Sequence, residues 1–315
     1  MYNSLIKYIV KKALLGIPTI LLVSLLLFLI MHSIPGDPIK LIAGERVDPS
    51  RVEELRRIWG LDKPLYIQYF YWLVRLLQGD FGVSIVTKQK VSYLILSRLP
   101  YTIELTLTSL LISYLIGVPT GIIASLSRGS KLDFALMSMV AFFMSLPNYW
   151  LGLMLMLLFG LYLGLLPISG YSGPESLILP VITLALRPIA MIARLVRSEM
   201  LEVLSEDYIR TAWAKGLPER LVIFRHALRN SLIPVVVMFF LDLPWLIGGS
   251  VVIETVFAWP GMGRLLYRSI IVQDYPVVQG IILIIGVLTV ISNIIGDIVS
   301  AVLDPRIRIG GGEGE

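Results

Sequence analysis

Cysteine is absent from the 315 residues of this chain, and histidine occurs only twice, as His32 and His226. The lack of cysteine excludes disulfide bonds, zinc thiolate sites and thiol catalysis. The sequence also lacks the H-E-x-x-H zinc motif and the G-x-x-x-x-G-K-[ST] loop that cradles nucleotide phosphates. We therefore predict that the chain is not an enzyme, with no catalytic residue, no metal site and no cofactor of its own.

Charged residues are also scarce in this sequence. Only 16% of the residues are charged and 56% are hydrophobic, whereas a soluble domain carries about a quarter charged residues. The missing charge is absent from long blocks, and a helix of roughly 20 apolar residues crosses the hydrocarbon core of a bilayer. These blocks predict an all-α, multi-pass protein of the cell membrane.

Six blocks are long and apolar enough to be transmembrane helices. The first follows three lysines and could be a secretory signal, but its length and the lack of a small-x-small site favour a retained span. We expect a kink at Pro147-Asn148 in the third block, and interruptions at Arg187-Pro188 in the fourth and at Asp242 and Pro244 in the fifth. The blocks are Ala13–Met31, Thr102–Leu126, a stretch within Phe134–Leu166, Leu177–Ala193, Ser231–Ile253 and Pro276–Gly296.

The distribution of Lys and Arg predicts the orientation of the spans. The segments on one side hold 14 of these residues, against two in the short loops 167–176 and 254–275. Because cytoplasmic loops carry the excess of Lys and Arg, both termini are expected inside the cell. The 14 residues lie in segments 1–12, 127–133, 194–230 and 304–315.

These spans divide the chain into four parts. Residues 1–31 form the cytoplasmic N-terminus and first span, and residues 32–101 form a long outer segment. Helical patterns at Arg51–Trp59 and Pro64–Leu77 predict interfacial helices there, lying among lipid headgroups. Residues 102–303 form the transmembrane core, which includes a cytoplasmic hairpin at 198–230. The glycine-rich tail, 304–315, is expected to be cytoplasmic and unstructured.

The hairpin is the most informative segment. Its pattern predicts a first helix ending near Lys215, a left-handed turn residue at Gly216, and a second helix opened by Pro218. The first helix would carry an apolar face of Ile209, Ala212, Trp213 and Gly216. The second would carry Leu221, Phe224 and Leu228, surrounded by Arg220, Arg225 and Arg229. An apolar seam with a cationic rim predicts a docking surface for another protein.

The hairpin pattern has two other interpretations. The spacing from Ala212 through Gly216 to Val222 is also that of a DNA-binding helix-turn-helix. The hairpin is tethered between two membrane spans, and Pro218 and Glu219 occupy the start of the would-be recognition helix, so we expect no nucleic acid partner. An ordinary connecting loop would not need this length or this amphipathic pattern.

Residues Tyr208–Leu217, Phe224–Asn230 and Pro234 resemble the EAA loop of ABC-importer permeases, in the form found in the peptide/nickel branch. The generic letters E-A-A fall on Arg210-Thr211-Ala212, so that only Ala212 and Gly216 match the general motif. Further blocks agree in order along the chain, and the long outer segment resembles that of the B-type permease. These blocks are Pro35–Pro38, Gly60–Leu73, Gln78–Ser84, Ile253–Leu266, Asp274–Gly280 and Leu303–Arg308.

The resemblance implies the type I ABC importer permease fold and a division of labour among subunits. It implies a second, C-type permease, two ABC ATPase subunits that bind ATP and Mg, and an extracytoplasmic substrate-binding protein. The imported solutes would be peptides or related solutes such as oligosaccharides or nickel complexes. Docking on the ATPase would use Asp207, Tyr208, Ile209, Arg210, Ala212, Lys215, Gly216, Leu217, Phe224 and Arg225.

Polar residues inside spans are candidates for the translocation path, because they are costly in lipid. Asp242 would either contact a substrate amine or hydroxyl, or pair with Arg187; Asn148 and Glu104 are weaker candidates. Family members commonly carry an uncharged polar residue near Asp242. Trp259-Pro260-Gly261 is expected to build a turn that supports the outer gate.

The competing function is an ATP-independent secondary transporter. Such a protein should show paired broken helices in two related halves. The sequence has no convincing internal repeat, and the cytoplasmic hairpin would have no role in such a protein.

Overall fold

The computed structural model of the protein describes residues 2–33 and 62–303, and nearly all of them are helical. Within these residues the β structure is limited to a single bridge between Val83 and Lys90. The elements are α1 (Tyr2–Ser33), α4 (Leu65–Leu77), α5 (Val91–Leu126), α6 (Lys131–Ser145), α7 (Asn148–Leu155), the π-helix η1 (Met156–Tyr162), the 3-10 helix η2 (Pro174–Leu177), α8 (Ile178–Leu204), α9 (Asp207–Ala214), α10 (Glu219–Leu221), the π-helix η3 (Val222–Ala227), α11 (Leu228–Val256), α12 (Met262–Ile271) and α13 (Tyr275–Leu303).

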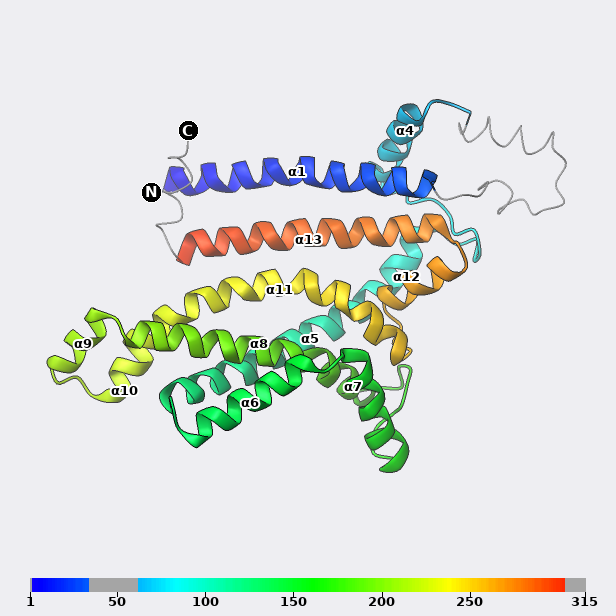
Figure 1. Ribbon diagram of the computed structural model, residues 1–315. Coiled ribbons are helices and arrows are strands. Elements are labelled where there is room, and N and C mark those ends of the chain that lie inside the picture. Colours follow the sequence, from blue (N-terminus) through cyan, green and yellow to red (C-terminus); the bar gives the residue numbers. More distant parts are fainter. Residues whose placement is uncertain (1, 34–61, 304–315) are drawn as a thin grey trace.

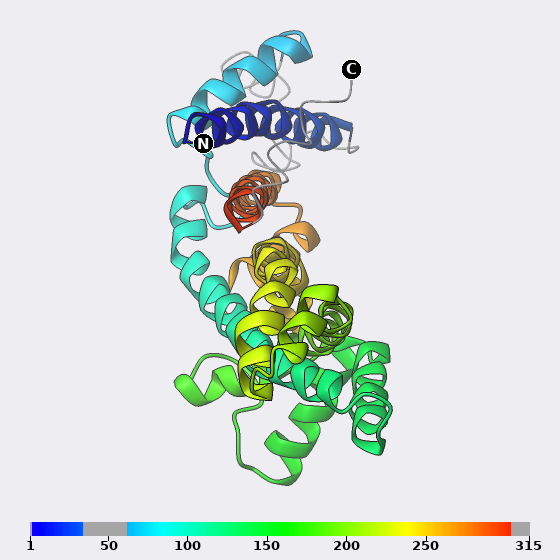
Figure 2. The same cartoon turned by 90° about the vertical axis from the view of Figure 1, so that its left-hand side faces the viewer.

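The long helices α1, α13, α11 and α8 run side by side, and α5 crosses obliquely behind α11 and α8 (Figure 1). Figure 2 shows α13, α11 and α8 nearly end-on, stacked below α1, with α5 running obliquely along them. The start of α1, the end of α13 and the α9–α10 hairpin lie at one end of the molecule, and α4 and α12 lie at the other (Figure 1). The segments that the Lys and Arg distribution predicts to share one side of the membrane therefore lie at one end of the molecule.

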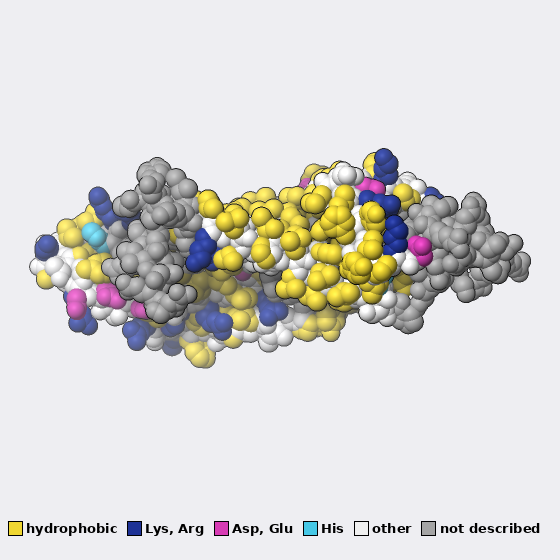
Figure 3. Space-filling model, turned by 90° about the horizontal axis from the view of Figure 1, so that it is seen from above, with side chains coloured by type: hydrophobic (Ala, Val, Ile, Leu, Met, Phe, Trp, Pro, Cys, Tyr) yellow, Lys and Arg dark blue, Asp and Glu magenta, His cyan; other side chains and the backbone are white. Residues whose placement is uncertain are grey.

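In the part of the chain that the structure describes, five helices are long and apolar enough to cross a membrane, and a sixth span results if the bent pair α6 and α7–η1 is one crossing. Figure 3 shows hydrophobic side chains covering the middle of one face, with charged side chains gathered toward its two ends. Helix α1 exposes many leucines and isoleucines, among them Leu14, Leu22 and Ile30. Such a surface suits contact with lipid tails.

The predicted kink in the third span is confirmed. Helix α6 ends at Ser145 and α7 begins at Asn148, and the two helical segments are bent by 99°. Pro147 precedes α7 as its N-cap residue. Proline lacks a backbone N–H and disfavours helix for the residue before it, so the helix breaks there.

The interruptions expected in the fourth and fifth spans are wrong. Helix α8 continues through Arg187-Pro188, and α11 continues through Asp242 and Pro244. A long membrane helix tolerates an internal proline because neighbouring helices and local adjustments satisfy the freed carbonyl. Pro188 is buried in this way within the helical bundle.

The second span begins earlier than predicted. Helix α5 starts at Val91 and not at Thr102, and it contains Pro100. Its first turns are held by apolar packing, since Val91, Leu94 and Ile95 are buried against Met262 and Ile281 of α12 and α13. This packing extends the helix into a region that the sequence pattern assigns to the outer segment.

Helix α4 is present where the pattern predicted an amphipathic helix. Its Tyr69 and Trp72 rings pack on Phe28 of α1, and the Tyr69 and Ser24 hydroxyl groups are 2.8 Å apart. Tyr66 and Phe70 of α4 are exposed. The location of α4 among headgroups stays a prediction. Four predicted segments lie outside the described residues, one of them in part. They are the helix expected at Arg51–Trp59, the block Pro35–Pro38, the tail 304–315, and all of the block Leu303–Arg308 except Leu303.

Helices α5 and α8 form the tightest contact in the bundle. A Cβ atom at Gly121 would lie 2.5 Å from the Ala193 carbonyl oxygen and 2.6 Å from Val196 Cβ. A Cβ atom at Gly117, one turn earlier, would lie 2.9 Å from the Ile189 carbonyl oxygen. Small residues four apart let two membrane helices approach backbone to backbone. Helix α8, which leads into the hairpin, is therefore firmly seated on α5.

Candidate coupling hairpin and translocation path

The hairpin has the turn that its sequence predicts. Helix α9 ends at Ala214, Lys215 is its C-cap residue, and Gly216 adopts φ +71°. The Gly216 N–H donates to the Trp213 carbonyl at 2.9 Å and the Leu217 N–H donates to the Ala212 carbonyl at 3.3 Å. Positive φ favours glycine because a Cβ atom is strained there. Pro218 then precedes α10, as expected.

The second arm differs from the expected separate short helix. Helix α10 runs directly into the π-helix η3, and η3 runs directly into α11. A π-helical turn inserts extra backbone into a helix without ending it. The second arm is therefore continuous with the fifth span.

The inner face of the hairpin packs on the ends of the spans. Ile209 is fully buried and Ala212 is 7% exposed, and both belong to one apolar cluster with Met200 of α8. Leu217 packs against the same cluster. These three predicted docking residues therefore hold the hairpin against the membrane domain. Trp213, predicted to share their face, is 44% exposed.

The outer face of the second arm presents charge around the Phe224 ring. Phe224 is 60% exposed and lies in an open hollow of about 610 Å³, whose lining residues are Arg220, Leu221, Phe224, Arg225 and Arg229. Arg210 forms an exposed ion pair with Asp207 at 3.3 Å. The Asn230 side chain donates a hydrogen bond to the Tyr208 hydroxyl at 2.8 Å. Of the predicted docking residues, those exposed are Asp207, Tyr208, Arg210, Lys215, Gly216, Phe224 and Arg225.

The translocation-path candidates are not gathered into one cluster of contacts. Asp242 on α11 accepts a hydrogen bond from the Tyr114 hydroxyl on α5 at 3.1 Å. The described ion pairs do not join Asp242 to Arg187, which is exposed on α8. Asn148 is the half-buried first residue of α7. The structure thus gives Asp242 a different partner from the one expected.

Tyr114 is a residue that sequence reasoning missed. Its ring packs edge-on against Phe239, with ring centroids 5.1 Å apart, while its hydroxyl faces Asp242. The signal was present, because a tyrosine within an apolar span needs a partner for its hydroxyl. Which partner it finds depends on how α5 and α11 cross, and the sequence pattern does not specify that crossing.

The outer end of α11 forms the turn expected at Trp259-Pro260-Gly261. Glu254 is fully buried and accepts hydrogen bonds from Thr102 Oγ1 at 2.7 Å and from the Arg264 N–H at 3.0 Å. Trp259, also fully buried, donates its Nε1–H to the Tyr101 carbonyl at 2.9 Å. A Cβ atom at Gly261 would overlap the Glu254 carboxylate. Glu254 thus fastens the turn to the start of α12.

Two further features stiffen this outer end. The buried Asp274 accepts hydrogen bonds from the Ser84 hydroxyl and from the Ile85 N–H, the latter at 3.0 Å. Arg264 donates to the Ala258 carbonyl, and its burial, together with the charges of Arg268 and Arg98, lowers the pKa of its guanidinium. The outer segment and the last loop are therefore joined.

Comparisons with known proteins agree with these features. Residues 117–309 match the family described as binding-protein-dependent transport system inner membrane component, and residues 5–106 match its N-terminal family. The oligopeptide transport system permease protein AppB of Bacillus subtilis (strain 168) is 41% identical over 312 residues, covering 96% of this chain and 99% of the relative. The glutathione transport system permease protein GsiC of Escherichia coli (strain K12) is 42% identical over 304 residues, with the same coverage of each.

Solved structures show the same fold. A structure described as an inward-facing conformation of the MetNI methionine ABC transporter aligns with a TM-score of 0.56 at 20% identity. The alignment covers 67% of this chain and 97% of the other. The fold is that of a type I ABC importer permease. This chain belongs to the family of binding-protein-dependent transport system inner membrane components, and it is a multi-pass permease subunit of an ABC importer.

Proposed function

We propose that this chain forms half of the translocation path of a peptide importer and couples it to a separate ATPase through the α9–α10 hairpin. Its partners are a second permease of the C type, two ABC ATPase subunits and an extracytoplasmic substrate-binding protein. ATP and Mg bind to the ATPase subunits. The relatives named for oligopeptides and for glutathione support a peptide as substrate.

The observation that supports this proposal most is the division of the hairpin into two faces. Ile209 and Ala212 anchor it to the membrane domain, while Phe224 and its surrounding arginines remain open. Clusters of exposed Arg around an aromatic side chain are typical of interface hot spots. The second arm continues into α11, so that closure of an ATPase dimer would act on the span that carries Asp242.

Asp242 is the proposed contact for a peptide. A carboxylate inside a span is costly unless it is hydrogen-bonded or paired. Among the described residues, the Asp242 carboxylate accepts one hydrogen bond, from Tyr114, and further acceptor positions on it remain. A peptide's ammonium group provides both the charge and the donors that this carboxylate lacks. Arg187 and Asn148 remain candidates for the same path at other places on α8 and α7.

The coupling role is tested by Gly216→Val in the complete importer. A β-branched residue is strained at φ +71°, so the angle between the two arms should change. We expect ATP-dependent uptake of a labelled tripeptide into vesicles to fall by about tenfold or more. Membrane insertion of the chain should be unchanged.

Gly170→Val is the matched control. Gly170 has φ +81°, and open space surrounds its Cβ position as it does at Gly216, but it lies in the outer loop. Uptake should survive this change. Full uptake by the Gly216→Val importer would refute the coupling role. Uptake without ATP hydrolysis would favour a secondary transporter instead.

A further inference from the structure

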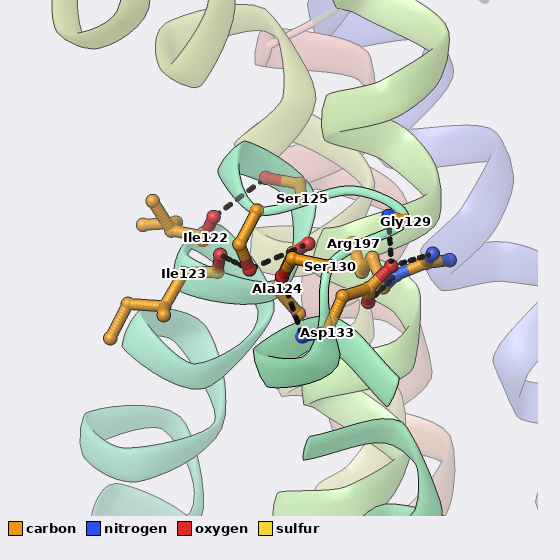
Figure 4. A network of polar contacts seen from close by, with 9 residues as sticks. Ile122, Ile123, Ala124, Ser125, Gly129, Ser130, Asp133 and Arg197 are labelled. Carbon is orange, nitrogen blue, oxygen red and sulfur yellow. Dashed lines mark hydrogen bonds and ion pairs between the residues drawn. The ribbon is translucent and has the colours of Figure 1, made fainter. Parts of the chain in front are cut away.

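The turn between α5 and α6 is tied to α8 by a salt bridge outside the hairpin. The Asp133 carboxylate accepts hydrogen bonds from Arg197 Nε at 2.7 Å and from the Arg197 terminal nitrogen Nη2 at 2.8 Å. Figure 4 shows the guanidinium facing both carboxylate oxygens. The Asp133 side chain is only 7% exposed. A bidentate pair of this kind fixes both distance and orientation.

The turn itself holds Asp133 in place for this contact. The Gly129 N–H donates to the same carboxylate at 3.0 Å, and Gly129 has φ +76°. The Ser130 hydroxyl oxygen caps α6 by accepting a hydrogen bond from the Asp133 N–H at 3.2 Å. Arg197 directly precedes the hairpin segment that begins at residue 198. The salt bridge therefore joins the base of the hairpin to the first turn of α6.

Elsewhere α6 packs on α8 through an apolar cluster, to which Met137, Phe143 and Met144 of α6 also contribute. Val140 packs against Ala190 and Ala193, while Phe134 and Phe142 are exposed on other sides of α6. Apolar packing between membrane helices has no hydrophobic driving force, because lipid tails are equally apolar. The Asp133–Arg197 pair adds to this apolar packing a polar contact of fixed distance and direction.

The other end of the broken span reaches the outer turn. After the 99° bend, Gly152 of α7 packs so closely on Phe257 that an added Cβ atom would lie 3.0 Å from the Phe257 ring. Phe257 is buried at the end of α11, beside the turn that Glu254 fastens. The third span therefore contacts α8 near the hairpin through α6 and contacts the outer turn after α11 through α7.

We propose that Asp133 and Arg197 are positioning residues that make α6 follow α8 when the hairpin moves. The broken span then carries the movement to the outer turn, as a rigid element pivoting about a hinge. This inference rests on the proposed docking of the hairpin on an ATPase subunit. It assigns the third span, and not only the fourth and fifth, to the moving unit.

The test measures distances in the complete importer. The chain has no native cysteine, so spin labels can be attached at Val10→Cys on α1 and at either Phe134→Cys on α6 or Ser198→Cys on α8, all three exposed positions. Pulsed electron paramagnetic resonance then compares each distance in the absence and presence of ATP with vanadate. In the parent protein both distances should shift together.

Asp133→Asn removes the negative charge of the carboxylate, while the asparagine side chain has nearly the same size. We expect the ATP-dependent shift from residue 10 to residue 198 to persist, and the shift from residue 10 to residue 134 to fall to about half or less. Ser127→Ala is the matched control in the same turn, because the Ser127 hydroxyl bonds to the Ile123 carbonyl of its own helix. Both shifts should persist in that control.

Several outcomes would overturn the inference. One is an unchanged shift at residue 134 in Asp133→Asn, and another is an equal loss of both shifts. Should Asp133→Asn fail to assemble with the ATPase, Arg197→Lys is measured in its place with the same expectation, because lysine cannot bind both oxygens in a fixed plane. If the distance between residues 10 and 198 in the parent protein does not change with ATP and vanadate, that result would contradict the proposed docking instead.

Discussion

At the scale of single residues, one tyrosine hydroxyl orients the carboxylate proposed to meet the substrate. Tyr114 reaches across from α5 to Asp242 on α11, and Phe239 supports its ring. The sequence drew attention to Asp242 because carboxylates within spans are costly. It could not supply Tyr114, because the pairing depends on the rotation of two helices about their axes. The sequence pattern suggested Arg187 as a partner for Asp242, because pairing lowers the cost of a charge within a span.

Asp242→Asn tests the proposed contact with the peptide ammonium. Loss of the charge should lower the rate of uptake of a tripeptide with a free amino terminus by roughly tenfold, since charge-assisted hydrogen bonds are stronger than neutral ones. Uptake of the N-acetylated tripeptide should change little. Both rates are measured by ATP-dependent uptake into vesicles. An equal fall for both peptides would show that Asp242 has a structural role.

At the scale of elements, apolar blocks were enough to locate the spans but not their ends. The kink at Pro147 could be predicted because proline lacks a backbone N–H and so interrupts a helix. Pro147 lies between α6 and α7 as the N-cap residue of α7. The same reasoning failed at Pro188, which is buried within an uninterrupted α8. The difference lies in tertiary packing, which local sequence does not encode. Packing against α12 and α13 likewise extends α5 back to Val91.

Gly121→Ala tests the close contact between α5 and α8. The added methyl group would overlap the Ala193 carbonyl oxygen, so the two helices must separate. We expect thermal unfolding in detergent to report destabilisation by about 1–3 kcal/mol. Gly248→Ala on α11 is the matched control, because its Cβ position has no neighbour within 4 Å. Equal stability of the two variants would contradict the packing described for α5 and α8.

At the scale of the whole molecule, an inner docking surface and a fastened outer turn lie at opposite ends of the helical bundle (Figure 1). Orientation, hairpin and turn at Gly216 could all be predicted, because charge asymmetry and glycine conformation are local properties of the sequence. Three features could be seen only in the folded structure: the burial of Ile209 against the spans, the continuous second arm of the hairpin, and the Asp133–Arg197 pair. Each of them joins the hairpin to the spans.

The most direct test of the account is the location of the hairpin in the assembled importer. Lys215→Cys places a single thiol on its exposed turn, in a chain with no native cysteine. A membrane-impermeant maleimide should label this thiol in inside-out vesicles, and a thiol cross-linker should join it to the ATPase subunit. Labelling in right-side-out vesicles, with no cross-link to the ATPase, would contradict the account.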